Sequence, residues 1–377
     1  MRKVLAIATV AAGALLLCVV SLLAYSTVLQ RRTASALAIQ SPNGIQEAGY
    51  ERIGGLRQWI QIRGEDRRNP VLLCLNGGPG ASWIPLTPWF RAWERRFTVV
   101  QWDQRGEGKT LESTGPSIAS TMTIDTMSHD GIEVAEFVRR RLGAGKVVLL
   151  GHSWGSILGI HMIKARPDLF AAYVGTGQVG DLSRSLRLSY AVTLARAKAA
   201  HDDRTAGELT RIGPPPYDEA HMQNVATLFG ALGAYAPASD REIMAKMPGA
   251  ILSAPNYSLR DIQYRNAGFT SVPPASLYLA MEKTDLLRLG PDFKVPVYFF
   301  AGDGDNVTVL SETKRYFDQI RAPRKALVVF PGGGHFVVWS MSDRFLAELI
   351  SNLAWLSRRA DESTPHGARR GRSPRAG

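Results

Sequence analysis

The fold of this 377-residue chain is decided by the stretch Val147-Val148-Leu149-Leu150-Gly151-His152-Ser153-Trp154-Gly155. Its first four residues form a short apolar run typical of a buried strand, and residues 154–165 are compatible with a helix. Between them stands the pattern Gly-x-Ser-x-Gly, in which glycines flank the serine because the turn is very tight. A chance match to three fixed residues is common in long chains, but here the strand and the helix stand on the required sides. The stretch therefore predicts a sharp turn that raises the Ser153 hydroxyl at a helix N-terminus.

Short apolar runs alternate with helical patterns along most of the chain. Several runs are continuous Val, Leu and Phe without polar alternation, as expected of strands that are covered on both faces. The expected strands are residues 58–62, 71–75, 98–102, 147–150, 297–301 and 326–330. Such alternation predicts an α/β fold with a mostly parallel sheet flanked by helices.

The alternation stops after a strand-like run at residues 173–177 and resumes at Val295. The roughly 110 residues between are rich in Ala, Leu and Arg, have helical character, and are interrupted by Pro214-Pro215-Pro216. We expect a helical cap at residues 178–288, inserted above the carboxyl edge of the sheet. The core is then expected in two parts, residues 49–177 and 289–358.

The N-terminal segment contains no charged residue from Val4 to Leu29. As a helix, these residues would span about 39 Å, more than the ~30 Å hydrocarbon core of a bilayer. Residues 1–30 therefore predict a transmembrane anchor, followed by a linker at residues 31–48. A cleaved signal peptide, which would make the protein secreted, is the alternative. It fits less well because the apolar stretch is long and Ala36-Leu37-Ala38 lies beyond the Arg31-Arg32 pair.

Basic residues are nearly balanced across this segment, with Arg2 and Lys3 before it and Arg31 and Arg32 after it. The charge rule for membrane proteins slightly favours a cytoplasmic N-terminus. The expected topology is a single-pass membrane protein whose folded part lies on the external or periplasmic side.

The formal net charge of +12 is partly concentrated in the C-terminal residues 359–377, together with Gly, Pro and Ser. Such a composition cannot bury enough apolar surface to fold, so we expect a disordered basic tail and no nucleic-acid partner. The basic residues of this tail are compatible with weak attraction to anionic lipid headgroups. The two cysteines, Cys18 and Cys74, both lie in apolar runs and predict no disulfide.

A serine hydroxyl is a poor nucleophile at neutral pH and needs a histidine base that a carboxylate orients. In folds with this serine turn, the chain order is serine, acid, histidine. Of the seven histidines, His335 alone follows a late strand and a glycine loop. The strand at 297–301 runs into two candidate acids, Asp305, which we prefer, and Asp303, the alternative. The other aspartate is expected to be a turn residue.

Acyl transfer also needs donors for the developing oxyanion, each worth on the order of 3 kcal/mol. The strand at 71–75 ends in Asn76-Gly77-Gly78-Pro79-Gly80, and we expect the backbone N–H groups of Gly78 and Trp154 to be these donors. A simple glycine-rich turn is the alternative. Neither a metal nor a cofactor is implied, because no residue cluster has metal-ligand spacing and the Gly108-Lys109-Thr110 run lacks the glycine of a phosphate-binding loop.

Several motifs together resemble the proline iminopeptidase family of α/β-hydrolases. They are Asn76-Gly-Gly-Pro-Gly80, Trp102-Asp-Gln-Arg-Gly106, Gly151-His-Ser-Trp-Gly-Ser156, and the late Gly-x-x-Asp and Gly-Gly-His elements. The resemblance covers roughly residues 50–177 and 289–356 and implies an α/β-hydrolase fold. It places the family's nucleophile on Ser153, its acid on Asp305, its base on His335, and its oxyanion donors on Gly78 and Trp154. The family usually has His where this chain has Asn76.

The resemblance implies a serine hydrolase that forms an acyl-enzyme on a small molecule or short peptide. Family members with aminopeptidase activity hold the substrate's amino group with carboxylates of the cap. The cap here contains Glu208, Asp218, Glu219 and Glu282 among others, but the Trp-Glu element usual in the family's cap is missing. An aminopeptidase is therefore expected first, and a carboxylesterase acting on small apolar esters is the alternative. A non-catalytic binding protein is disfavoured because no triad member is lost.

Overall fold

An eight-stranded sheet forms the centre of the molecule, which we describe from a computed structural model that covers residues 2–255 and 257–356. The strand order is β1-β2-β4-β3-β5-β6-β7-β8. The strands are β1 (Ile45–Ile53), β2 (Leu56–Gly64), β3 (Val71–Leu75), β4 (Thr98–Trp102), β5 (Val147–His152), β6 (Phe170–Thr176), β7 (Val297–Gly302) and β8 (Lys325–Phe330). Strands β1 and β2 are antiparallel to their neighbours, whereas β4, β3 and β5 to β8 are parallel. The sheet is mostly parallel, as predicted.

Each central strand is buried on both faces, which explains the unbroken apolar runs. In β5, Val147 and Leu149 belong to one core cluster, and Val148 and Leu150 to another. The first cluster includes helices α3 (Ile124–Leu142), α4 (Trp154–Ala165) and α11 (Leu310–Gln319); the second includes α13 (Ser342–Leu353). The sheet is thus a middle layer between two layers of helices, with successive strand residues pointing to opposite cores.

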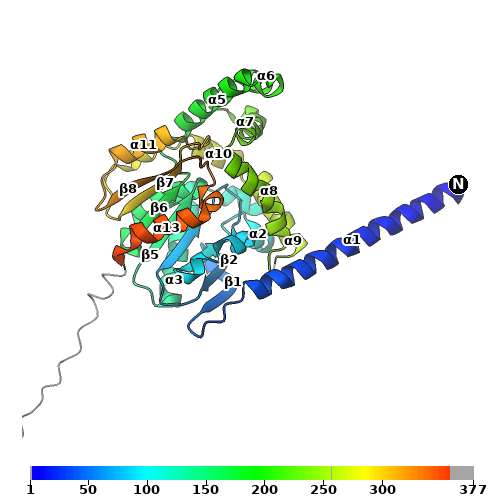
Figure 1. The fold of residues 1–377 in the computed structure, drawn as a ribbon, viewed down its shortest axis with the longest axis horizontal. Helices are drawn as coiled ribbons and strands as arrows, with labels where there is room; N and C mark the ends of the chain where they lie inside the picture. The colour runs from blue at the N-terminus through cyan, green and yellow to red at the C-terminus, as the bar shows by residue number, and fades with distance from the viewer. Residues whose placement is uncertain (1, 256, 357–377) are drawn as a thin grey trace, which may run out of the picture.

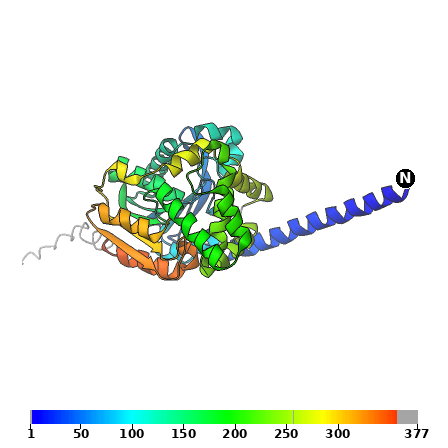
Figure 2. The same ribbon diagram turned by 90° about the horizontal axis from the view of Figure 1, so that it is seen from above.

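Six helices stand between β6 and β7 where the cap is predicted. They are α5 (Leu182–Ala199), α6 (Asp203–Ile212), α7 (Gln223–Ala234), α8 (Ala238–Leu252), α9 (Leu259–Thr270) and α10 (Ala275–Glu282). Helices α5 and α6 stand furthest from the sheet (Figure 1), and in the view from above the green cap helices lie in front of the sheet (Figure 2). Helix α9 packs on α2 (Gly108–Thr114), and α8 packs on α12 (Val337–Ser340).

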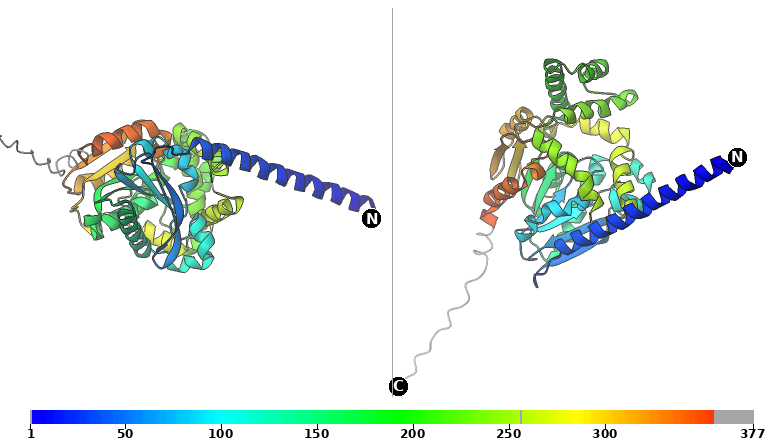
Figure 3. Two further views of the ribbon diagram at one scale, coloured as in Figure 1. Left: turned by 90° about the horizontal axis from the view of Figure 1, so that it is seen from below. Right: turned by 45° about the vertical axis from the view of Figure 1, so that its right-hand side comes forward.

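The N-terminal helix α1 (Arg2–Ala36) projects from the body as a single rod (Figures 1 and 3). A stretch of 18 residues within Val10–Ala36 has a mean hydropathy of 2.2, and the helix is long and apolar enough to cross a bilayer. The end of α1 contacts the cap: Ser26 Oγ donates to Leu252 O (3.2 Å), and Gln30 Nε2 donates to Tyr257 O (2.7 Å). The last turns of α1 are therefore attached to the connection between α8 and α9.

The segment between helix α1 and the sheet is shorter than the expected linker of residues 31–48. Helix α1 continues through Ala36, and β1 begins at Ile45. Strand β1 escaped sequence-based prediction because it lies at the edge of the sheet, where only its terminal residues Ile45 and Ile53 are buried. The predicted disordered tail at residues 359–377 lies outside the described residues.

Candidate active site

Ser153 stands in the sharp turn between the end of β5 and the start of α4. Its backbone has φ 52° and ψ −117°, a strained conformation for a residue with a side chain. The turn is held from the neighbouring strand, because Ser153 N–H donates to Thr176 O at 3.0 Å. Strain of this kind persists where the surrounding structure fixes the backbone, and it occurs frequently at functional sites.

The two glycines of the Gly-x-Ser-x-Gly pattern are there for steric reasons. A Cβ on Gly151 would lie 2.6 Å from Gly155 O, and a Cβ on Gly155 would overlap the carbonyl oxygen of Leu75. Strand β3 thus passes directly against the first turn of α4. Any larger residue at either position would push the turn away from the sheet.

His335 and Asp305 form a buried pair on the loops that follow β8 and β7. His335 Nδ1 lies 2.9 Å from Asp305 Oδ2, and their side chains are 7% and 1% exposed. Asp305 also accepts hydrogen bonds from the Thr308 hydroxyl (2.7 Å) and from the backbone N–H groups of Val307 and Thr308 (both 2.8 Å). These bonds therefore hold the Asp305 carboxylate in contact with the His335 imidazole.

Asp303, the alternative acid, is placed differently. Its Oδ1 accepts the backbone N–H of Gly332 at 2.7 Å, and its side chain is exposed. Asp303 therefore joins two loops as a turn residue, whereas Asp305 faces the imidazole. The sequence alone makes both residues candidates for the acid that orients His335, because they are two positions apart on one loop.

The Asp305 contact fixes which nitrogen of His335 carries the proton. An ionised carboxylate only accepts, so Nδ1 is the protonated nitrogen of the neutral ring and Nε2 is free to accept a proton. Burial opposes ionisation of Asp305, but the charge and hydrogen bond of His335 outweigh it and lower the pKa of the carboxyl. Burial likewise acts to lower the pKa of His335, yet the Asp305 charge prevails and raises that pKa.

The imidazole of His335 lies beside the serine turn. Gly177, at φ +52°, passes so close that a Cβ there would be 2.8 Å from His335 Cε1. The residue before Ser153 contacts the same loop, because His152 Nε2 donates to the carbonyl of His335 at 3.0 Å. No hydrogen bond joins Ser153 Oγ to His335 Nε2 among the described residues. Such bonds are often long in unliganded hydrolases and tighten when substrate binds.

The glycine loop after β3 lies against Ser153 from the other side. A Cβ on Gly77 would be 3.3 Å from Ser153 Cβ and 2.7 Å from His152 Nδ1. Gly78 follows with φ +126°, and Trp154 is the first residue of α4. Gly77, the neighbour of the predicted donor Gly78, thus lies against Ser153, and the other predicted donor, Trp154, begins a helix whose dipole favours negative charge.

The family described as alpha/beta hydrolase fold matches residues 70–340 of this chain. The chain belongs to the α/β-hydrolase family. Among curated relatives, the probable aminopeptidase YbaC of Bacillus subtilis is 32% identical over 310 residues, covering 75% of this chain and 88% of the relative. A proline iminopeptidase of Saccharolobus solfataricus is 35% identical over 133 residues, covering 35% of this chain and 41% of the relative. These relatives confirm the resemblance to proline iminopeptidases and show that the chain is a hydrolase.

Solved structures agree with this α/β-hydrolase fold. A proline iminopeptidase-related protein from Thermus thermophilus aligns with a TM-score of 0.58 at 21% identity, over 82% of this chain and 98% of that one. The proline iminopeptidase of Mycobacterium smegmatis aligns with a TM-score of 0.56 at 19% identity, over 84% of this chain and 100% of that one. At these identities the likeness establishes the fold.

The cap of this hydrolase is attached to the His335 loop by Asp240 on α8. The Asp240 carboxylate is fully buried and accepts from the backbone N–H of Phe336 and from the Ser340 hydroxyl, both at 3.1 Å. Helix α9 reaches the glycine loop, because a Cβ on Gly80 would overlap the carbonyl oxygen of Gly268, and Arg265 Nε donates to Ser82 O just beyond the loop at 3.3 Å. Helices α8 and α9 therefore cover the site from above.

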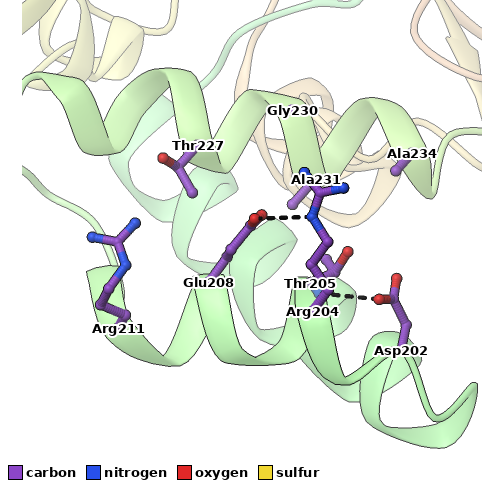
Figure 4. Close-up of a pocket in the computed structure, with 9 residues that line it drawn as sticks. All are labelled: Asp202, Arg204, Thr205, Glu208, Arg211, Thr227, Gly230, Ala231 and Ala234. Atoms are coloured by element: carbon purple, nitrogen blue, oxygen red, sulfur yellow. Dashed lines mark hydrogen bonds and ion pairs between the residues drawn. The ribbon is translucent and has the colours of Figure 1, made fainter.

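A cavity of about 510 Å³ lies elsewhere, between α6 and α7 of the cap (Figure 4). Charged side chains line it, and Glu208 pairs with Arg204 at 3.2 Å. None of the predicted site residues lines this cavity. A smaller cavity of about 190 Å³ is lined by Asp303, Asp305 and residues of α5, so it reaches the acid loop of the hydrolase.

Two supporting residues of the site escaped sequence reasoning. Thr308 had a detectable signal, since a hydroxyl three residues after an aspartate commonly bonds back to it in a turn. Asp240 had none, because it stands in the cap, nearly 100 residues before the loop that it contacts. Arg105, in the Trp102–Gly106 motif, forms a buried ion pair with Asp130 at 2.8 Å.

Proposed function

We propose that this α/β-hydrolase is a serine hydrolase that cleaves an amide or ester bond through an acyl-enzyme. The observation that carries the proposal is the buried His335–Asp305 pair, 2.9 Å apart, on loops beside the strained Ser153 turn. These are the nucleophile, the base and the orienting acid of a triad, in the chain order of this fold. The two core parts, 49–177 and 289–358, supply all three, and the 178–288 cap covers them.

The reaction runs in two half-reactions. His335 Nε2 takes the proton of the Ser153 hydroxyl while Ser153 Oγ attacks the substrate carbonyl carbon. The N–H groups of Gly78 and Trp154 stabilise the oxyanion, and His335 returns the proton to the leaving amine or alcohol as the C–N or C–O bond breaks. Water, deprotonated by His335, then attacks the acyl-enzyme, and His335 returns the proton to Ser153 Oγ as the acyl C–O bond breaks and the acid is released.

Aminopeptidase action on short peptides is our proposal for the substrate class, supported by the aminopeptidase and proline iminopeptidase names of the relatives. Three of the cap carboxylates considered from the sequence are partly or fully exposed: Glu208, Asp218 and Glu219. Glu282 is buried, 2% exposed, and its Oε1 has no hydrogen-bond partner among the described residues. Of the four, Glu282 is therefore the one whose carboxylate is shielded from water.

A carboxylesterase acting on small apolar esters is the second candidate. The exposure of the other three cap carboxylates favours this candidate. Only one of the four carboxylates, Glu282, is buried and could pair with a substrate amine away from water. A free-amine requirement separates the two activities. An aminopeptidase should hydrolyse an aminoacyl amide and reject its N-blocked form, whereas an esterase should accept p-nitrophenyl acetate and hydrolyse neither amide.

A fluorophosphonate probe tests the serine mechanism. The wild-type protein should be labelled, and Ser153→Ala should not, while Ser120→Ala, which removes an exposed hydroxyl bonded to Ser117 O, is a control that should keep labelling. Equal labelling of wild type and Ser153→Ala would remove Ser153 from the proposal.

The apolar helix α1 supports a membrane-anchored enzyme with one span. Residues 2–25 would span about 36 Å as a helix, enough for the hydrocarbon core, and the cap contacts begin at Ser26. We propose that the catalytic part lies on the external or periplasmic side. Protection from an added protease in intact cells, or its absence, decides the side.

A further inference from the structure

Four buried polar side chains form one hydrogen-bonded chain that ends at the serine turn. Asn76 Nδ2 donates to Glu107 Oε1 at 2.8 Å, and Gln104 Nε2 donates to Asn76 Oδ1 at 3.0 Å. Gln104 Oε1 in turn accepts the indole N–H of Trp154 at 3.0 Å. Each of the four side chains belongs to a residue that is at most 1% exposed, so water does not compete for these bonds.

The donor and acceptor groups of these side chains determine how the two amides in the hydrogen-bonded series are oriented. Both oxygens of Glu107 accept N–H donors in the structure, because Oε1 accepts from Asn76 Nδ2 and the Gly80 N–H and Oε2 accepts from the Gln104 N–H. The Trp154 indole only donates, so the amide oxygen of Gln104 must face that end. The remaining Asn76 oxygen and Gln104 nitrogen then meet as acceptor and donor. Only one orientation of both amides then satisfies every group, and the Trp154 indole sets it, with the Asn76 amide nitrogen facing Glu107.

Glu107 also accepts hydrogen bonds from two backbone N–H groups. Its Oε1 accepts the N–H of Gly80 at 3.0 Å, and its Oε2 accepts the N–H of Gln104 at 3.1 Å. Together with Asn76, these contacts fix the first and last residues of the 76–80 loop to one carboxylate. Gly78, the proposed oxyanion donor, lies midway between the two fixed points.

Burying Glu107 in this position destabilises the fold. Glu107 is fully buried and has no ion pair among the described residues. Burial, with the negative charge of Asp103 adding to it, raises the pKa of Glu107 to about 8. A buried carboxyl group without a salt bridge destabilises the fold, and such a cost is expected where the group has a function that offsets it.

We propose that Glu107 is a positioning residue for the oxyanion hole, which sets the Gly78 N–H relative to the Trp154 N–H through Asn76 and Gln104. This inference rests on the proposed serine mechanism. Asn76 is thereby explained as well: it supplies the donor that Glu107 needs and the acceptor that Gln104 needs, at the position where the resembling family usually has His.

Glu107→Gln removes one acceptor oxygen and sets an NH2 group against a donor. At least one of the Asn76, Gly80 and Gln104 N–H groups then lacks a partner, and the loop shifts. Misplacement of a reacting or stabilising group by about 1 Å can cost on the order of 100-fold in rate. We expect a loss of about 10- to 100-fold in kcat on p-nitrophenyl acetate and in the rate of fluorophosphonate labelling, with KM close to wild type.

Gln104→Leu is the second variant, because it breaks the chain between Asn76 and Trp154 and leaves Glu107 in place. Asp130→Asn is the matched control: Asp130 is an equally buried carboxylate that accepts from Arg105 and Gln58 and does not contact the 76–80 loop. Rates are normalised to folded protein. The pH dependence of the labelling rate is also recorded. Its rise with pH, which reports deprotonation of His335, should occur at the same pH in both variants and in wild type.

The inference is supported when Glu107→Gln and Gln104→Leu lose kcat with unchanged KM and an unchanged pH limb, while Asp130→Asn keeps kcat. Wild-type kcat in folded Glu107→Gln and Gln104→Leu would overturn it. Gln104→Leu decides alone where Glu107→Gln does not fold. Persistent labelling of Ser153→Ala, in contrast, would overturn the serine mechanism itself, so the two failures are distinguishable.

Discussion

His152 donates its Nε2–H to the backbone carbonyl of His335 at 3.0 Å, and their ring centroids are 4.9 Å apart. Because a carbonyl only accepts, the His152 proton lies on Nε2. Burial, with a further contribution from the His335 charge, lowers the pKa of His152 to about 3, so this ring stays neutral. The residue before the proposed nucleophile thereby fixes the loop of the proposed base.

His152→Phe should keep the ring packing and remove the donor. The buried carbonyl of His335 then lacks a partner, which costs about 1–3 kcal/mol of folding free energy, and the base is less well positioned. We expect a lower unfolding temperature together with a loss of about tenfold or more in kcat/KM. The exposed His129 on α3 gives the control, since His129→Phe should change neither quantity.

The pH profile should report His335. Activity needs the neutral imidazole, and because the pKa of His335 is raised above its ordinary 6.5, the rising limb of kcat/KM should lie above pH 6.5. Asp305→Asn removes the charge and replaces one acceptor oxygen with an NH2 donor, so the limb should move to lower pH while kcat falls by about 10⁴-fold. Asp303→Asn should leave the limb in place. A profile that shifts with Asp303 instead would make Asp303 the acid.

Stability should fall as the pH rises from about 4 to 8. Burial raises the pKa of Glu107 to about 8 and that of Asp103 to about 7, whereas both ionise near 4 in the unfolded chain. Between these values the unfolded chain binds fewer protons than the folded one, so unfolding becomes more favourable with pH. Unfolding temperatures measured at pH 5 and pH 8 should differ less in Glu107→Gln than in wild type. An equal difference in both proteins would contradict the burial of an ionising Glu107.

The anchor can be tested by truncation. Full-length protein should stay with membranes after alkaline extraction, and a form lacking residues 1–25 should be released while it retains Ser153-dependent labelling. A form lacking residues 1–37 also loses the Ser26 and Gln30 contacts with the cap, so it should unfold at a lower temperature than the first form. Identical unfolding temperatures would show that α1 does not stabilise the α8–α9 connection.

The sequence was sufficient to predict features that depend on local geometry. The run 147–155 predicts strand, turn and helix by itself, because the glycines and the apolar residues act within a few positions. Long-range contacts could not be predicted in this way. The choice between Asp305 and Asp303 depends on how β7 and β8 lie side by side, and the attachment of Asp240 to Phe336 depends on where the cap folds back. Edge strand β1 was missed because its pattern is polar.

The central claim is that Ser153 is the nucleophile and that His335 activates it. Fluorophosphonate-treated wild-type protein can be digested and the modified peptide located by mass spectrometry. The account predicts a single adduct on Ser153, formed far more slowly in His335→Ala. An adduct on another residue, or equally fast modification of Ser153 without His335, would contradict it.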